Sequence, residues 1–229
     1  MITRDEFAKT IDHTILKPDT TYEQVKLVCE EAISYNFASV CILPSFIIYA
    51  KDILCGTDVK VCTVIGFPLG ANITPVKLFE MDEAIENGAS EVDIVVNNTF
   101  LKSKEFERYR DEISLINDIA HSLKVTTKFI IETSLLDKEE KIIATRIIND
   151  CGADFVKTST GFIGGGATLD DVNLLKSHCT ERTKVKASGG IRTLDDALKF
   201  IEAGASRIGT SSSVKIMKEF DTRLFDLGF

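Results

Sequence analysis

The sequence lacks the features that mark a membrane protein or a chain of several domains. It contains no tryptophan, and its four prolines and 14 glycines are scattered through the 229 residues without forming a linker, so we expect one domain spanning residues 1–229. The N-terminus has no apolar signal-peptide core, and no apolar run reaches membrane-spanning length. We therefore expect a cytoplasmic protein with no membrane partner.

Histidine and cysteine are too few and too scattered to suggest a metal site. The three histidines form no HxxH or HxxxH pair, and the six cysteines form no CxxC pair. Zinc sites need spacings of this kind, so we expect no metal and no cofactor. Buried, reduced thiols are the simpler interpretation of the cysteines, since a cytosolic chain of this length does not need disulfides.

The composition favours a globular protein without a nucleic-acid partner. Hydrophobic residues make up 44% and charged residues 27% of the chain, an ordinary globular mixture. Lysine and arginine number 27 against 35 aspartates and glutamates, so the formal net charge is −8. Coating a nucleic acid needs a net basic face. An anionic small substrate stays compatible with this charge if basic side chains gather at one site.

Short apolar runs alternate with longer segments of helical periodicity along the chain. The runs occupy residues 11–16, 39–43, 59–65, 91–96, 125–131, 154–158, 184–187 and 207–209. Helices are expected between them, for example over 74–87, 105–122 and 137–149, the last beginning with a capping box. This alternation fits a closed (βα)8 TIM barrel with a short N-terminal helix, whereas an open doubly wound sheet would need a GxGxxG turn that the sequence lacks.

A weak internal repeat relates three of these units. In each unit a glycine ends a helical segment, where it favours the left-handed conformation. These glycines are Gly88, Gly152 and Gly204. Five residues after them stand Asp93, Lys157 and Gly209. If the units are equivalent, two ionisable groups lie at one height in the barrel, which packing alone would not favour because burying charge is costly.

Lys157 is the candidate nucleophile. It interrupts an apolar run, and a lysine inside a barrel is costly unless it is paired or neutral. One hypothesis is an amine that forms a Schiff base with a carbonyl substrate; the alternative is a lysine whose head reaches solvent at the barrel rim. Lys186 on the next strand favours the first hypothesis, because a second cation disfavours protonation of its neighbour. A role for Lys186 in phosphate binding alone stays open.

Asp93 is the candidate acid/base group. A carboxylate at this height can hold a water molecule or Lys186 and relay protons, while the alternative is a structural ion pair between strands. Further residues in or beside the runs are candidates for lining the pocket. These are Asp12, Cys41, Lys128 and Thr158.

Glycine-containing turns follow the seventh and eighth runs, at 188–192 and 209–213. Glycines let backbone N–H groups approach an anion, and the N-terminus of a following helix adds partial positive charge. Barrel enzymes commonly bind phosphate at this place, so we expect a phosphate site, although two ordinary tight turns would look the same. The glycine run 164–166 is expected to form a flexible turn or a lid.

Seven motifs occur in order along the chain: IDHTILKPDTT, VCTVIGFPLGA, EVDIVVN, KFIIET, GADFVKTSTGF, VKASGGIRT and IGTSSS. Together they closely resemble the deoxyribose-phosphate aldolases, a family of class I aldolases on a (βα)8 barrel. The resemblance covers nearly the whole chain. It implies reversible cleavage of 2-deoxy-D-ribose 5-phosphate to D-glyceraldehyde 3-phosphate and acetaldehyde, without a metal, in deoxyribonucleotide catabolism. It also implies a cytoplasmic homodimer.

The resemblance further assigns roles by motif position. Lys157 corresponds to the Schiff-base lysine, Lys186 to the lysine that tunes the protonation of the nucleophile and transfers protons, and Asp93 to the proton donor and acceptor. Other residues correspond to the positions where the family holds phosphate. These are Gly161, Gly189, Gly190, Gly209, Ser211 and Ser212.

The chain departs from the family pattern in two places. It reads CILPSF from Cys41 onward, where bacterial relatives often have CVNP, and it ends in Asp226-Leu-Gly-Phe229, where some members end in a tyrosine that reaches the active site. Two other functions stay open. One is an aldolase or isomerase acting on another sugar phosphate, and the other is a barrel that binds a sugar phosphate without catalysis.

Overall fold

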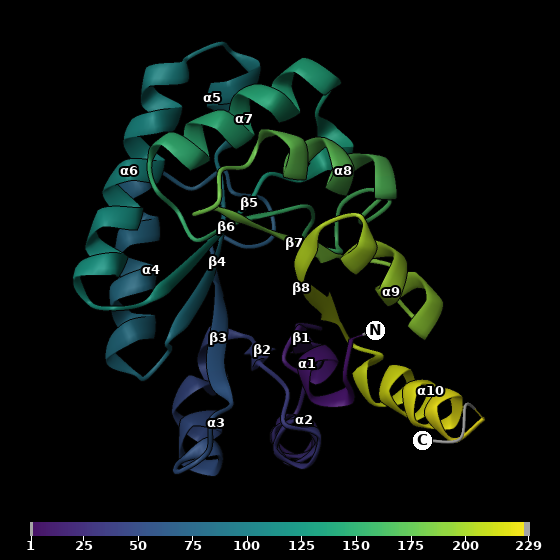
Figure 1. The fold of residues 1–229 in the computed structure, drawn as a ribbon. Helices are drawn as coiled ribbons and strands as arrows, with labels where there is room; N and C mark the ends of the chain where they lie inside the picture. The colour runs from purple at the N-terminus through teal and green to yellow at the C-terminus, as the bar shows by residue number, and fades with distance from the viewer. Residues whose placement is uncertain (1, 227–229) are drawn as a thin grey trace.

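The computed structural model describes residues 2–226 of the chain. Parallel strands close into a barrel in which each strand pairs with the next and the last pairs with the first (Figure 1). The strands are β1 (Ile11–Ile15), β2 (Ser39–Ile42), β3 (Lys60–Ile65), β4 (Glu91–Val95), β5 (Thr126–Ile130), β6 (Phe155–Lys157), β7 (Lys184–Ser188) and β8 (Ala205–Thr210). This closed parallel barrel confirms the expected fold class.

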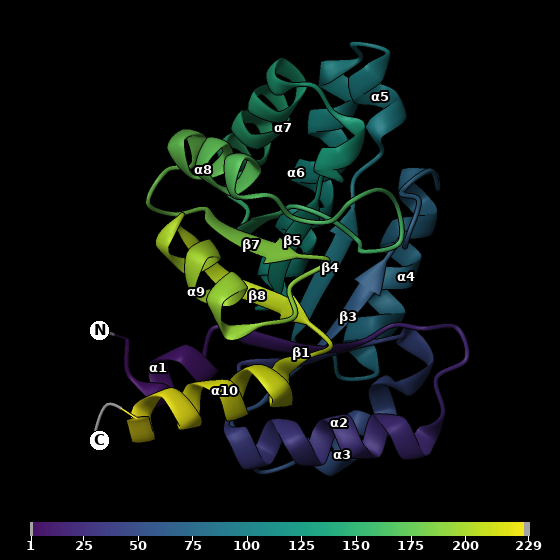
Figure 2. The ribbon, with the colours of Figure 1, turned by 90° about the vertical axis from the view of Figure 1, so that its right-hand side faces the viewer.

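Helices connect the strands and surround the barrel, as two views at right angles show (Figures 1 and 2). The α-helices are α1 (Arg4–Ala8), α2 (Tyr22–Tyr35), α3 (Ile47–Leu54), α4 (Thr74–Glu86), α5 (Asn98–Lys102), α6 (Phe106–Ser122), α7 (Lys138–Asp150), α8 (Leu169–His178), α9 (Leu194–Glu202) and α10 (Ser213–Asp226). The 3-10 turns η1 (Pro44–Phe46) and η2 (Thr133–Leu135) follow β2 and β5. Within residues 2–226, no helix is both long and apolar enough to cross a membrane.

The short N-terminal helix expected from the sequence is α1. It begins with a capping box, in which the Thr3 side chain accepts a hydrogen bond from the Glu6 backbone and the Glu6 side chain accepts one from the Thr3 backbone. The helix lies beside α10 in both views (Figures 1 and 2), and the Phe7 ring stacks on the Phe220 ring with centroids 5.0 Å apart. The first and last described helices therefore pack together beside β1.

The expected strands differ from the observed ones by no more than two residues at either end. The largest difference is in β8, which spans Ala205–Thr210 rather than 207–209. The expected helix start at Asp137 is also confirmed, because Asp137 caps α7 in a capping box with Glu140. Element boundaries shift this easily because helix and strand ends fray.

The glycines of the internal repeat adopt the conformation expected of them. Each lies one residue beyond the cap of its helix, and φ is +113° at Gly88, +72° at Gly152 and +104° at Gly204. A residue with a Cβ would be strained at these angles. The repeat therefore marks three equivalent entries from a helix into a barrel strand.

The two faces of the barrel wall differ in chemistry. Phe129 on β5 and Val156 on β6 are fully buried in the apolar layer between the strands and the helices. Their sequence neighbours Lys128 and Lys157 instead contact Asp93 on β4. Because β4 and β6 are not adjacent in the barrel, the contact between Lys157 and Asp93 runs through its interior. The interior therefore carries charge, while the outer layer forms the main apolar core.

Candidate active site

A buried carboxylate inside the barrel contacts lysines from three consecutive strands. Asp93 accepts hydrogen bonds at Oδ2 from Nζ of Lys157, at 2.7 Å, and from Nζ of Lys186, at 2.6 Å. At Oδ1 it accepts a 3.0 Å hydrogen bond from Nζ of Lys128. Strand register brings these groups together, since Lys157 is the Cα partner of Lys186 and Asp93 that of Lys128. The nucleophile, acid/base and second-lysine candidates thus form one contiguous cluster.

A second layer of charges extends this cluster within the barrel. The Lys186 Nζ lies 2.5 Å from Oδ2 of Asp12, and Asp12 Oδ1 accepts a 2.8 Å hydrogen bond from Nε of Arg207. Glu91 Oε2 lies 2.8 Å from the Arg207 guanidinium and 2.6 Å from Lys128 Nζ. Asp12 is therefore joined to the cluster as expected. His13, the next residue on β1, points the other way, since its Nε2 lies 2.7 Å from Oε2 of Glu31 on α2.

The mutual attraction of these groups outweighs the cost of burial. Burial opposes ionisation of Asp93, but the ammonium groups of Lys128, Lys157 and Lys186 hold the pKa of the Asp93 carboxyl well below its ordinary value. Burial also lowers the pKa of Lys186, yet Asp12 and Asp93 more than compensate and raise that pKa above its ordinary value. Lys186 is accordingly a cation, and Asp93 a carboxylate, throughout the physiological pH range.

A cavity of about 670 Å³ opens where β1, β6, β7 and β8 end. Its size suits a small metabolite, and it lies at the face where barrels of this type hold their active sites. The predicted site residues that line it are Lys157, Gly161, Gly189, Gly190, Gly209 and Ser211. Lys17 and Arg192, which the sequence analysis did not single out, also line the cavity and add positive charge.

Glycine is required at several points of the cavity wall. Gly161, Gly189 and Gly190 have φ of +83°, +89° and +80°, which disfavours any residue with a Cβ. At Gly209 a Cβ would lie 3.2 Å from Cε of Lys186, so glycine leaves room for the lysine stem. Ser212, the remaining predicted phosphate residue, directly precedes the first residue of α10 and is not part of the cavity wall.

The other candidate pocket residues are buried behind the cavity wall. Cys41 on β2 is fully buried, with its Sγ 4.0 Å from Oδ2 of Asp93. Thr158 is also fully buried, and its Oγ1 accepts a 3.2 Å hydrogen bond from the backbone N–H of Ser188. Lys128 contacts Asp93 but does not reach the cavity. These residues lie next to groups of the site but are not among those that line the cavity, so their role in the pocket stays a prediction.

The two departures from the family pattern fall in different places. Leu43 packs with Leu16, Val64 and Phe67 in a small apolar cluster that also contains Cys41, so this part of the barrel mouth is apolar. The chain terminus, where the sequence analysis notes the absent tyrosine, lies outside the described residues.

The glycine run expected to be a flexible turn or lid follows β6. Gly166 has φ of +81°, and a Cβ there would lie 2.4 Å from the carbonyl oxygen of Gly189. The Ala167 N–H donates a 3.0 Å hydrogen bond to the Ser188 carbonyl. A Cβ at Gly165, in contrast, would meet no atom within 4 Å beyond its own chain neighbours. The end of this turn therefore packs on the turn after β7, and movement of the rest stays a prediction.

Besides Lys17 and Arg192, three residues of the site were missed by the sequence analysis as functional groups. Arg207 on β8 bridges Asp12 and Glu91, and its position inside an expected strand was the available signal. Cys62 on β3 lies with its Sγ 3.2 Å from Oδ1 of Asp93. Glu132 accepts hydrogen bonds from the backbone N–H of Thr160 at 2.9 Å and from its hydroxyl at 2.6 Å, an arrangement that no local sequence pattern indicates.

Comparisons with known proteins agree with this geometry. The family described as DeoC/LacD family aldolase matches residues 7–219. A deoxyribose-phosphate aldolase of Clostridium kluyveri is 52% identical over 217 residues, which cover 94% of this chain and 99% of that protein. One from Caldanaerobacter subterraneus is 52% identical over 214 residues, covering 93% of both chains. The solved deoxyribose phosphate aldolase of Aeropyrum pernix, described as tetrameric, superposes with a TM-score of 0.89 at 36% identity and covers 96% of this chain and 93% of its own.

The closed barrel, with a lysine–carboxylate cluster inside it, and the matching family together identify an aldolase of the (βα)8-barrel class. The family match spans residues 7–219, and a curated relative is 52% identical, so the chain can be assigned to one family within that class. The chain belongs to the DeoC/LacD family of aldolases.

Proposed function

We propose that this chain cleaves 2-deoxy-D-ribose 5-phosphate reversibly to D-glyceraldehyde 3-phosphate and acetaldehyde through a Schiff base on Lys157. The matching family and the relatives named deoxyribose-phosphate aldolase support the reaction. The observation that carries the mechanism is the position of Lys157. It is the cluster lysine that lines the cavity, and its Nζ lies 2.7 Å from the Asp93 carboxylate.

The cluster contains more basic groups than carboxylates. Lys128, Lys157, Lys186 and Arg207 face only three carboxylates, so the cluster holds one more base than acid. The carboxylates raise the pKa values of Lys128, Lys186 and Arg207 above their ordinary values, against the lowering effect of burial. Lys157 is the base of this cluster that lines the cavity, and attack on a carbonyl requires the neutral form of an amine.

The reaction then needs proton transfers that the cluster can perform. The neutral amine attacks the C1 carbonyl of the open-chain sugar, and loss of water gives an iminium ion. Removal of the C3 hydroxyl proton lets the C2–C3 bond break, with its electron pair taken up by the iminium to give an enamine. Asp93 Oδ2 contacts both Lys157 and Lys186, so one carboxylate oxygen can carry a proton between the two amines.

The loops around the cavity supply a site for the phosphate group. Gly189, Gly190 and Ser211, in the turns after β7 and β8, line the same cavity as Lys157. α10 begins at Ser213, so the partial positive charge of its N-terminus lies beside the second turn. A phosphate held there would direct the carbonyl end of the sugar toward Lys157.

A coupled assay for glyceraldehyde 3-phosphate released from deoxyribose 5-phosphate tests the proposal. Activity is expected in the unmodified protein and in Lys60→Ala, which alters an exposed lysine at the start of β3. Lys157→Ala is expected to abolish it. Ligand-induced stabilisation without turnover would instead favour a sugar-phosphate-binding barrel, and turnover of other sugar phosphates alone would favour a different aldolase or isomerase.

The proposal extends to where and how the protein works. A role in deoxyribonucleotide catabolism in the cytoplasm follows from the proposed substrate, and the six free thiols are compatible with a reducing compartment. We also propose a homodimer. Light scattering of the purified full-length protein tests this, and a tetramer, the state described for the Aeropyrum pernix aldolase, would contradict it.

A further inference from the structure

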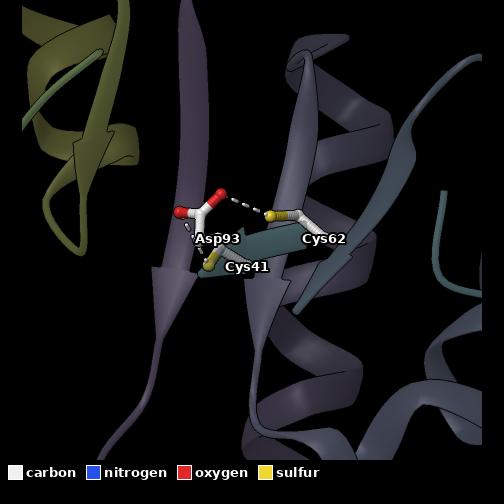
Figure 3. Close-up of side chains that lie close together, drawn as sticks. All are labelled: Cys41, Cys62 and Asp93. Atoms are coloured by element: carbon white, nitrogen blue, oxygen red, sulfur yellow. Dashed lines mark hydrogen bonds between the residues drawn. The ribbon is translucent and has the colours of Figure 1, made fainter. Parts of the chain in front are cut away.

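Two cysteines lie side by side beneath the proposed nucleophile. Cys41 on β2 and Cys62 on β3 are Cα partners on neighbouring strands, and both are fully buried inside the barrel. Figure 3 shows their sulfur atoms turned toward the carboxylate of Asp93. The Cys62 Sγ lies 3.2 Å from Oδ1 and the Cys41 Sγ lies 4.0 Å from Oδ2. The mechanism proposed above uses neither thiol.

The geometry is suitable for a covalent bond between these two sulfurs. Their Sγ atoms lie within 4.8 Å of each other. Paired strands are about 4.7–4.9 Å apart, which falls within the range of about 4.4–6.8 Å between the Cα atoms of disulfide-bonded cysteines. Rotation of the two side chains toward each other is therefore the main movement required, and the strands need not separate.

The surroundings make Cys41 the more reactive thiol of the pair. The neighbouring Cys62 side chain lowers the pKa of the Cys41 thiol, whereas burial raises the pKa of Cys62 well above its ordinary value. Thiolates are the nucleophilic form of cysteine. The sulfurs are joined to the cavity wall by a short chain of contacts, because Lys157 lines the cavity, Asp93 contacts Lys157, and both sulfurs lie beside Asp93.

We infer that Cys41 and Cys62 form a reversible disulfide when the enzyme meets hydrogen peroxide, and that this bond inactivates it. The Cys41 thiolate attacks one peroxide oxygen, so an S–O bond forms, the O–O bond breaks, and hydroxide leaves to become water with the thiol proton. The Cys62 sulfur then attacks Cys41, so the S–S bond forms and the S–O bond breaks. The departing hydroxide takes the Cys62 proton as the second water. Two thiols lose two electrons in total, and one peroxide is reduced to two waters.

Inactivation follows from the contacts that the bond removes. In the reduced protein the Cys62 thiol donates to Oδ1 of Asp93 and lies 3.3 Å from Nζ of Lys128. A disulfide has no proton to donate and draws the Cys62 sulfur toward Cys41. Asp93 Oδ1 then loses a hydrogen-bond donor, while Oδ2 still holds Lys157 and Lys186. The carboxylate consequently changes its orientation.

A metal ion is the competing occupant of this place, since two thiols and a carboxylate are a plausible ligand set. Three lysine side chains already surround Asp93, and the positive charges of Lys128 and Lys186 would repel a divalent cation. A disulfide is neutral and meets no such repulsion. The charges of the cluster therefore favour oxidation over metal binding, and all tests are made with a chelator present.

The test treats the reduced full-length protein with hydrogen peroxide in EDTA and measures crosslinking and aldolase activity on the same samples. Free thiols are alkylated after denaturation, and non-reducing peptide mapping identifies any disulfide. We expect a Cys41–Cys62 crosslink, a mass lower by two hydrogens, activity lost in proportion to the crosslinked fraction, and full recovery with dithiothreitol. Cys29→Ala, which removes a buried thiol on α2, should behave identically, whereas Cys62→Ala should form no internal disulfide.

Three results would overturn the inference. These are activity lost while Cys41 and Cys62 both remain alkylatable, a disulfide between a different pair, and a Cys41–Cys62 crosslink that leaves activity intact. Mapping on the unmodified protein decides the first two even if Cys62→Ala does not fold. The inference uses the proposed aldolase activity only as a readout, and failure of that function would be seen in the reduced protein before any oxidant is added.

Discussion

Replacing Lys186 by leucine tests whether its charge keeps Lys157 neutral. Both Nζ atoms bond to the same oxygen of Asp93, at 2.7 Å and 2.6 Å, so the two nitrogens are no more than 5.3 Å apart. Two unit charges at that distance repel by about 3 kcal/mol at an effective dielectric constant of about 20. That energy corresponds to about two pH units in a protonation equilibrium. Loss of the second cation also leaves Asp93 free to hold a protonated Lys157 more tightly.

The assay is the rate of borohydride-trappable adduct formation with acetaldehyde as a function of pH, measured by mass spectrometry. The acid limb of this profile is expected to move about two pH units toward alkaline pH in Lys186→Leu. Turnover should fall further than the lost neutral amine explains, because a proton-transfer partner of Asp93 is also gone. Lys77→Leu is the matched control, since it removes a buried lysine that pairs with Glu112 at 2.7 Å outside the cluster. An unchanged acid limb in Lys186→Leu would refute the charge argument and leave Lys186 with phosphate binding or proton relay alone.

Four further results are expected. Ser211→Asp places a like charge beside the substrate phosphate and should raise KM for deoxyribose 5-phosphate by about tenfold or more, but leave KM for plain deoxyribose nearly unchanged; equal losses would place the phosphate elsewhere. Gly166→Ala should lower the free energy of unfolding in urea by about 2–4 kcal/mol, because φ is +81° and the new Cβ would lie 2.4 Å from a carbonyl oxygen. Its control, Gly165→Ala, should change the free energy of unfolding by less than about 0.5 kcal/mol. EDTA should leave activity unchanged, and a loss reversed by zinc would contradict the Schiff-base mechanism. Burial raises the folded-state pKa of Asp12, but the neighbouring cations outweigh it and lower that pKa below its ordinary value. The ionised carboxylate therefore stabilises the folded protein above the unfolded-state pKa of about 3.9, and this stabilisation is lost as the pH falls below that value. In Asp12→Asn, the free energy of unfolding in urea should accordingly decline less steeply below about pH 4.

The fold could be predicted because its signals are local. Runs of β-branched residues, a capping box at Asp137 and glycines with positive φ each depend on a few neighbouring residues. Their order along the chain then leaves few ways to close a parallel sheet. The ends of β6 and β8 could not be placed as well, because strand ends depend on pairing with neighbours that the sequence does not show.

The charged part of the site could be predicted where a charge interrupts an apolar strand. Lys157, Lys186 and Asp93 stand out in this way, and the five-residue count from the repeat glycines placed two of them at one height. The contact between Cys62 and Asp93 depends on how the barrel closes and on which side chains meet across its interior. Lys128 and Thr158 were named as possible pocket residues, and their contacts with Asp93 and Ser188 likewise depend on the closed barrel.

Reductive trapping of the adduct tests the central claim most directly. Acetaldehyde and borohydride are added to the full-length protein, and the modified peptide is identified by mass spectrometry. The account predicts a single adduct on Lys157, loss of activity in step with labelling, and no adduct in Lys157→Ala. Labelling of Lys128 or Lys186 in the unmodified protein, with Lys157 left free, would contradict it.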